Sequence, residues 1–177
     1  MSLAKTAEQI KTMEIRGAGK IAREAAAALR DHAETLPEAG LDAFVSEMNA
    51  AADLLLSTRP TAVSLPNAVR LVLHGVSDAK TEAEARALVK TRADRFIRSS
   101  ADALQRIAEI CAARIKDGMT VMTHCNSKAA LAGILQQHEQ GDEHRHDRKE
   151  NHRELRADGN GHHQRDDHGH RRAGTHD

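Results

Sequence analysis

The chain has 177 residues, with 26 basic side chains (Lys or Arg) and 26 acidic ones (Asp or Glu). This length excludes a large multidomain machine, and the zero net charge removes any argument for nucleic-acid or membrane binding from bulk charge. The composition changes sharply near residue 141. Residues 141–177 hold eight of the 12 histidines and only three apolar side chains. Such a segment cannot bury enough apolar area to offset its ordering entropy, so we predict a disordered histidine-rich tail.

The spacing of the two cysteines and the charged N-terminal residues indicate a protein of a reducing compartment. Cys111 and Cys125 stand 14 positions apart without a CxxC motif, so a disulfide framework is not expected. Charged residues occupy the N-terminus where a signal peptide would be apolar, and no run approaches the roughly 18 apolar residues of a membrane span. We expect a cytoplasmic, soluble protein without membrane contact.

Apolar residues recur at helical spacing in five successive segments of the first 117 residues. Glycine ends the first segment at Gly17, Pro60 follows the third, and Pro66 stands in the first turn of the fourth. The fifth segment carries one apolar stripe over seven or more turns. The five predicted helices span residues 2–15, 20–35, 41–56, 65–73 and 81–116, and they form a helical N-terminal domain, 1–117.

The period changes after Gly118. Residues 119–123 are a short β-prone run, 124–127 a polar turn, and 128–137 a helix. Strand, turn and helix in this order open a parallel α/β sheet, although no second strand follows. We therefore predict an α fold followed by the start of an α/β domain, with its first βα unit at 118–140 and the disordered tail at 141–177.

Three segments carry candidate chemistry. The segment from Met13 to Lys20 combines cations, two glycines and a helix start, which suits a phosphate or else is a plain charged turn. Arg59 lies in a loop stiffened by prolines and could bind phosphate bidentately or simply face solvent. Cys125 lies between a strand end and a helix start near Lys128, as a reactive thiolate or as a buried structural cysteine.

Histidine pairs occur repeatedly in the tail, at His144/His146, His162/His163 and His168/His170. Such pairs can hold nickel, zinc or copper ions. The same composition is equally typical of an out-of-frame extension. We favour a tail without function and assign no metal site.

The order of three longer motifs is more specific than any one of them. The chain reads Met-Glu-Ile-Arg-Gly-Ala-Gly-Lys, then Thr-Arg-Pro-Thr-Ala-Val-Ser-Leu-Pro-Asn-Ala, then Asp-Gly-Met-Thr-Val-Met-Thr-His-Cys-Asn-Ser-Lys-Ala-Ala. Over residues 8 to about 141 it resembles archaeal ribose-1,5-bisphosphate isomerases, within the superfamily of translation initiation factor 2B alpha-type subunits and methylthioribose-1-phosphate isomerases. The resemblance implies a helical domain followed by a Rossmann-like domain. It also implies conversion of ribose 1,5-bisphosphate to ribulose 1,5-bisphosphate in AMP breakdown, with no cofactor.

The resemblance also implies residue roles and partners. Cys125 matches the proton-abstracting cysteine, whose thiolate would remove the C2 proton while charge spreads into an enediolate. The substrate is a sugar bisphosphate, AMP is a candidate activator, and the full-length family forms homo-oligomers. The implied substrate-binding residues are Arg16, Gly17, Ala18, Gly19, Arg59, Ser127, Lys128 and Ala129.

One departure from the family pattern matters. The family's second catalytic group, a proton-donating aspartate on a later strand, has no counterpart in this sequence. We interpret this as a shifted reading frame or a truncation near residue 141, and we expect the chain as written to be inactive and poorly folded beyond residue 118. The alternative function is a non-catalytic, initiation-factor-like regulatory subunit that binds nucleotide or sugar phosphate. Retention of Cys125, of Arg16 to Gly19 and of Arg59 favours the enzyme.

Overall fold

The structure is a computed structural model that describes residues 2–123, 127–139 and 141. Its contacts divide the chain into two compact units, Met1–Gln136 and Gln137–Asp177. Almost all described residues belong to the first unit. The tail predicted for 141–177, including its histidine pairs, lies outside the described residues apart from residue 141.

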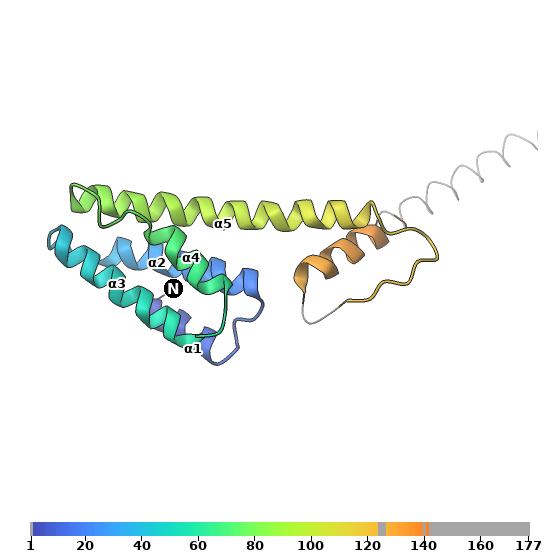
Figure 1. Cartoon of the computed structure of the whole chain (residues 1–177), viewed down its shortest axis with the longest axis horizontal. Coiled ribbons are helices and arrows are strands. Elements are labelled where there is room, and N and C mark those ends of the chain that lie inside the picture. The colour runs from blue at the N-terminus through green and yellow to red at the C-terminus, as the bar shows by residue number, and fades with distance from the viewer. Residues whose placement is uncertain (1, 124–126, 140, 142–177) are drawn as a thin grey trace, which may run out of the picture. The chain divides into compact units, whose positions relative to one another are not determined.

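Five helices make up most of the first unit (Figure 1). Each predicted helix is present, so the helical part of the predicted fold is confirmed. None of the helices in the described part is both long enough and apolar enough to cross a membrane. The helices are α1 (Leu3–Lys11), α2 (Ala18–Thr35), α3 (Leu41–Thr58), α4 (Ser64–Leu73) and α5 (Glu82–Ala112).

Local hydrogen bonds explain where the first and last of these helices begin. The Ser2 side chain accepts a hydrogen bond from the backbone N–H of Lys5 at the start of α1. At the start of α5, the Thr81 side chain accepts a hydrogen bond from the backbone N–H of Glu84. The Glu84 carboxylate in turn accepts a hydrogen bond of 2.8 Å from the backbone N–H of Lys80. These caps satisfy N–H groups that have no helical acceptor.

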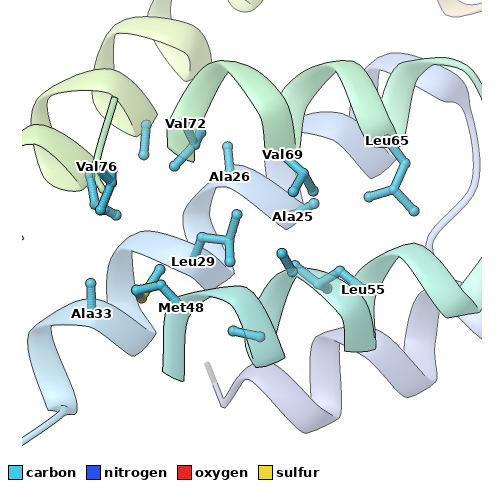
Figure 2. Packing of buried hydrophobic residues seen from close by; sticks show 14 of the residues in the cluster. Ala25, Ala26, Leu29, Ala33, Met48, Leu55, Leu65, Val69, Val72 and Val76 are labelled. Atoms are coloured by element: carbon cyan, nitrogen blue, oxygen red, sulfur yellow. The ribbon is translucent and has the colours of Figure 1, made fainter. Parts of the chain in front are cut away.

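The core lies where α2 meets α3, α4 and the first half of α5 (Figure 2). Ala25 and Ala26 of α2 are fully buried, and their small side chains let neighbouring helices approach closely. Larger side chains then fill the space between the helices. The largest fully buried ones are Ile10, Leu29, Met48, Leu55, Leu65, Val72 and Val89.

Polar contacts fix the antiparallel register of α2 against α5. Along α2 from Arg23 to Glu34, the partner residues on α5 run backwards from Ser100 to Lys90. The Arg30–Asp94 bond, 2.8 Å long, is the largest cause of the raised pKa of Arg30. The contacts are Arg23 to Ser100 (3.2 Å), Arg30 to Asp94, Lys90 to Glu34 (2.7 Å) and Arg86 to the carbonyl of Ala33.

Arg86 joins three helices at one end of the bundle. Its guanidinium donates to the Ala33 carbonyl of α2 and to the Glu82 carboxylate of α5. The same group lies over the ring of Phe44 in α3, 4.8 Å from the ring centroid. This cation–π contact and the two hydrogen bonds use the planar fork that distinguishes Arg from Lys.

The second half of α5 differs from the predicted continuous apolar stripe. Ala108 and Ala112 are buried, but Ile107 and Ile110 are 44% and 52% exposed. A further helix over residues 128–139, as predicted from Lys128 onward, packs against this half of α5. At the contact Gly133 is buried, and a side chain there would overlap the Cβ of Cys111. The missing Cβ therefore permits the approach.

Residues 119–123 were predicted to form a strand, but they have no regular secondary structure. A strand needs a partner with which to exchange backbone hydrogen bonds, and the described residues contain no second strand. Gly118, with φ of 81°, instead completes a turn closed by the bond from Met119 N–H to the Lys116 carbonyl (3.1 Å). The helix of the predicted βα unit at 118–140 is present, whereas its strand stays a prediction.

Candidate phosphate-binding site at the start of helix α2

The loop between α1 and α2 turns the chain sharply before the first motif. We predicted that the first helix extends to residue 15, but it ends at Lys11 because Met13 adopts φ of 65°, in the left-handed region. In this turn the backbone N–H of Ile15 donates a hydrogen bond to the Gln9 carbonyl, with 2.9 Å between nitrogen and oxygen. The Ile15 side chain is buried. Arg16, immediately after this anchored residue, is exposed to solvent.

The N-terminus of α2 is open to an anion. Gly17 is the N-cap residue, with φ of 89° and ψ of 129°, and it supplies no side-chain cap. The first backbone bond runs from Ile21 N–H to the Gly17 carbonyl, so the N–H groups of Ala18, Gly19 and Lys20 have no helical acceptor. The first turn also contains no acidic residue. The helix dipole and these N–H groups favour a negatively charged ligand.

Arg59 contacts the loop that precedes α2. It is the half-buried C-cap residue of α3, and its guanidinium donates to the thioether sulfur of Met13. The loops before α2 and before α4 therefore meet, at the same end of the bundle in Figure 1. The structure thus links two of the three predicted segments through Met13, the first residue of the first segment.

The third predicted segment is described only in part. Cys125 lies outside the described residues, so its predicted role stays a prediction. The Ser127 hydroxyl accepts a hydrogen bond from the Ala130 N–H at 3.3 Å and so caps the helix over 128–139. Lys128 is exposed, and Ala129 is half-buried.

Arg23, to which the sequence analysis gave no role, lies beside the start of α2. Its Nη1 atom lies 3.4 Å from the position that a Cβ on Gly19 would occupy, and it donates to the Ser100 hydroxyl of α5 at 3.2 Å. A side chain four residues along a helix points back over the preceding turn, so the spacing from Gly19 to Arg23 was an available signal. No signal in the sequence pointed to Ser100, the hydrogen-bond partner of Arg23 on α5.

Comparison with known families supports one assignment. Residues 14–147, most of the chain, match the initiation factor 2 subunit family. The chain belongs to the initiation factor 2 subunit family. The matched region includes both linked segments of the site, around Arg16 and Arg59.

Members of this family with named activities are similar to the chain in sequence. It is 49% identical over 141 residues to the ribose 1,5-bisphosphate isomerase of Thermococcus kodakarensis, a match covering 77% of this chain and 44% of that protein. The isomerase of the same name from Methanocaldococcus jannaschii is 45% identical over 141 residues, covering 80% and 44%. The chain therefore spans less than half the length of these relatives.

Solved structures share the fold of this region. The 5-methylthioribose 1-phosphate isomerase of Pyrococcus horikoshii matches with a TM-score of 0.69 at 26% identity, over 79% of this chain and 42% of that one. Subunit delta of the translation initiation factor eIF-2B from A. fulgidus matches with a TM-score of 0.65, also at 26% identity, over 79% and 44%. An enzyme and an initiation factor thus have the same architecture, and fold alone does not separate the two functions.

Proposed function

We propose that this chain forms the substrate-phosphate-binding part of an aldose–ketose isomerase that converts ribose 1,5-bisphosphate to ribulose 1,5-bisphosphate. The observation that carries the proposal is the identity of 49% to the Thermococcus kodakarensis ribose 1,5-bisphosphate isomerase, over 77% of this chain. This similarity is far above the 26% shared with the solved initiation factor subunit. It favours the enzyme over the regulatory alternative.

The geometry at the start of α2 supports phosphate as the ligand. A phosphate there would accept hydrogen bonds from the free N–H groups of the first turn and lie at the positive end of the helix dipole. Arg16 adjoins this turn, and Arg59 is tied to the loop before it through Met13. Guanidinium groups bind phosphate oxygens in pairs, which fixes orientation as well as adding affinity.

The reaction itself we assign to Cys125. A thiolate beside Lys128 and the start of the helix over 128–139 is stabilised by positive charge. It would take the proton from C2 while the bond from C1 to the ring oxygen breaks and that oxygen gains a proton from solvent, leaving an enol whose C1 keeps its phosphate. Loss of the proton from the 2-hydroxyl and protonation at C1 would then give the ketose. Ser127, Lys128 and Ala129 would then contact the substrate near this base.

The remaining parts of the proposal concern the molecule as a whole. We infer a helical domain over 1–117, the first βα unit of a Rossmann-like domain over 118–140, and a cytoplasmic location. The complete enzyme would act as a homo-oligomer, with AMP as its activator. The ligand would be a sugar bisphosphate, and neither nucleic acid nor membrane would be a partner.

A binding and turnover assay on the full chain tests the proposal. Calorimetric titration with ribose 1,5-bisphosphate should show binding, and Arg16→Ala and Arg59→Ala should each weaken it by about tenfold or more, since charge-assisted hydrogen bonds contribute about 1.5–3 kcal/mol. Arg98→Ala, which removes an exposed arginine of α5, is the matched control and should change nothing. Phosphorus NMR would detect ribulose 1,5-bisphosphate, and Cys125→Ser should abolish any turnover.

Two outcomes would contradict the proposal. Failure of the wild-type chain to bind ribose 1,5-bisphosphate would remove its basis. Turnover that persists in Cys125→Ser would exclude Cys125 as the base. Binding of nucleotide and of a translation factor, without isomerisation, would instead support the regulatory function suggested by the eIF-2B fold match.

A further inference from the structure

Arg23 lies against the first turn of α2, beside Gly19. The Arg23 Nη1 atom is 3.4 Å from the place a Cβ on Gly19 would take, so the guanidinium rests over the backbone of that turn. Gly17 needs glycine for its φ of 89°, whereas Gly19 is not among the glycines with positive φ. The backbone conformation therefore requires glycine at position 17 and not at position 19.

The charge of Arg23 is left unneutralised, unlike that of its neighbours along the α2–α5 contact. Arg30, Arg86 and Lys90 each form an ion pair with a carboxylate. Among the described residues, Arg23 instead donates one hydrogen bond, to the neutral hydroxyl of Ser100 at 3.2 Å. A guanidinium has five N–H donors, so most of them are available to a ligand.

Ser100 is well placed to hold this arginine in one orientation. It is half-buried on α5, and the Arg30–Asp94 bond of 2.8 Å, two turns further along α2, fixes the register of the two helices. The guanidinium is thus fixed beside the open N-terminus of α2, where Ala18, Gly19 and Lys20 present free N–H groups. An anion in this position would find both a full charge and backbone donors.

We propose that Arg23 binds a phosphate group of the sugar phosphate at the start of α2, and that Ser100 is its positioning residue. This inference rests on the proposed function for the site itself and adds to it a residue that the motif resemblance does not include. A bisphosphate carries two dianionic groups, and Arg23 supplies charge for one of them in addition to Arg16 and Arg59.

Titration calorimetry on the full chain tests this role with two probes, inorganic phosphate and ribose 1,5-bisphosphate. Arg23→Ala should weaken the binding of both by about tenfold or more, and Arg23→Lys should retain part of the affinity because it keeps the charge but not the fork. Ser100→Ala should weaken binding about two- to fivefold and should have little further effect in the Arg23→Ala background. Arg98→Ala removes an equal charge from an exposed position of α5 and should bind as the wild type does.

The outcomes separate this inference from the proposed function. If Arg16→Ala weakens binding while Arg23→Ala and Arg23→Lys bind as tightly as Arg98→Ala, Arg23 has no such role and the proposed function stands. If the wild type binds inorganic phosphate through Arg23 but does not bind ribose 1,5-bisphosphate, Arg23 binds phosphate, but its assignment to a sugar phosphate fails together with the proposed function. A wild type that binds neither probe overturns the inference. Circular dichroism melting identifies any variant that does not fold, and should Arg23→Ala be one, Arg23→Lys and Ser100→Ala decide the question.

Discussion

Two glycines that precede helices adopt backbone angles that other residues rarely adopt. Gly17 before α2 has φ of 89° and ψ of 129°, and Gly40 before α3 has φ of 93° and ψ of 159°. A Cβ at either position would meet nothing within 4 Å. The requirement for glycine is therefore conformational at both positions, and only Gly17 adjoins the candidate phosphate site.

This pair allows backbone strain to be separated from ligand binding. Gly17→Ala and Gly40→Ala should each lower the free energy of unfolding by about 1–3 kcal/mol, the usual cost of a strained backbone conformation. Only Gly17→Ala should also weaken binding of inorganic phosphate, because it shifts the first N–H groups of α2. Urea unfolding and calorimetric titration of both variants measure the two effects. Equal loss of phosphate binding in Gly40→Ala would show that the effect is global.

At the scale of elements, α5 serves two packing partners in succession. Its first half packs in the core of the α1–α4 bundle, through Ala85, Val89 and Ala93. Its second half receives the helix over 128–139, where Gly133 faces Cys111. The apolar face of α5 is buried in the first half and partly exposed in the second, and the packing partner changes between the two halves.

The contact at Gly133 predicts a size-dependent effect. Gly133→Ala should destabilise the docking of the helix over 128–139, because the new Cβ overlaps that of Cys111 and overpacking costs about 1–3 kcal/mol. Hydrogen exchange of residues 128–139 should become faster, while exchange in α2 to α4 should change little. The exchanged pair Cys111→Gly with Gly133→Ala moves the missing Cβ to the other helix and should restore part of the protection. Unchanged exchange in Gly133→Ala would show that the two helices do not pack there.

At the scale of the whole molecule, Glu82 ties the start of α5 to the loop between α2 and α3. Its carboxylate accepts from Arg86 and from the backbone N–H groups of Ala39 (3.1 Å) and Gly40 (2.8 Å). The hydrogen bond from Arg86 is the largest cause of the lowered pKa of Glu82. The contact joins segments more than 40 residues apart in the chain.

The lowered pKa of Glu82 gives the stability a pH dependence of known sign. The folded state favours the ionised carboxylate, so the stabilisation is complete above the ordinary glutamate pKa of about 4.3 and is lost as the pH falls through the lower folded pKa. Wild-type stability should therefore fall more steeply between about pH 5 and 3 than that of Glu82→Gln. Urea unfolding across this range measures the difference. Arg86→Gln should flatten the same part of the curve, and parallel curves for all three proteins would contradict the assignment.

The sequence by itself determined the local features of this protein. Helical periodicity, capping residues and the glycine and proline terminators predicted all five helices of the bundle and the helix from Lys128, because these signals act within one or two turns of chain. The residue types in Met13–Lys20 and around Arg59 left phosphate binding and plain charged loops as alternatives, and their role as a site stays a prediction. The predicted strand at 119–123 was not found in the described structure, since pairing depends on residues elsewhere.

Only the tertiary structure decided which of these residues act together. Met13 meets Arg59 across 46 positions, and Arg23 meets Ser100 across 77. The register of α2 on α5 sets the second contact, and the Arg30–Asp94 and Lys90–Glu34 pairs fix that register. Side-chain periodicity specifies which face of a helix is buried but not which residue of the opposing helix it meets. The helix packing therefore decides that the guanidinium of Arg23 lies beside the candidate site at the start of α2.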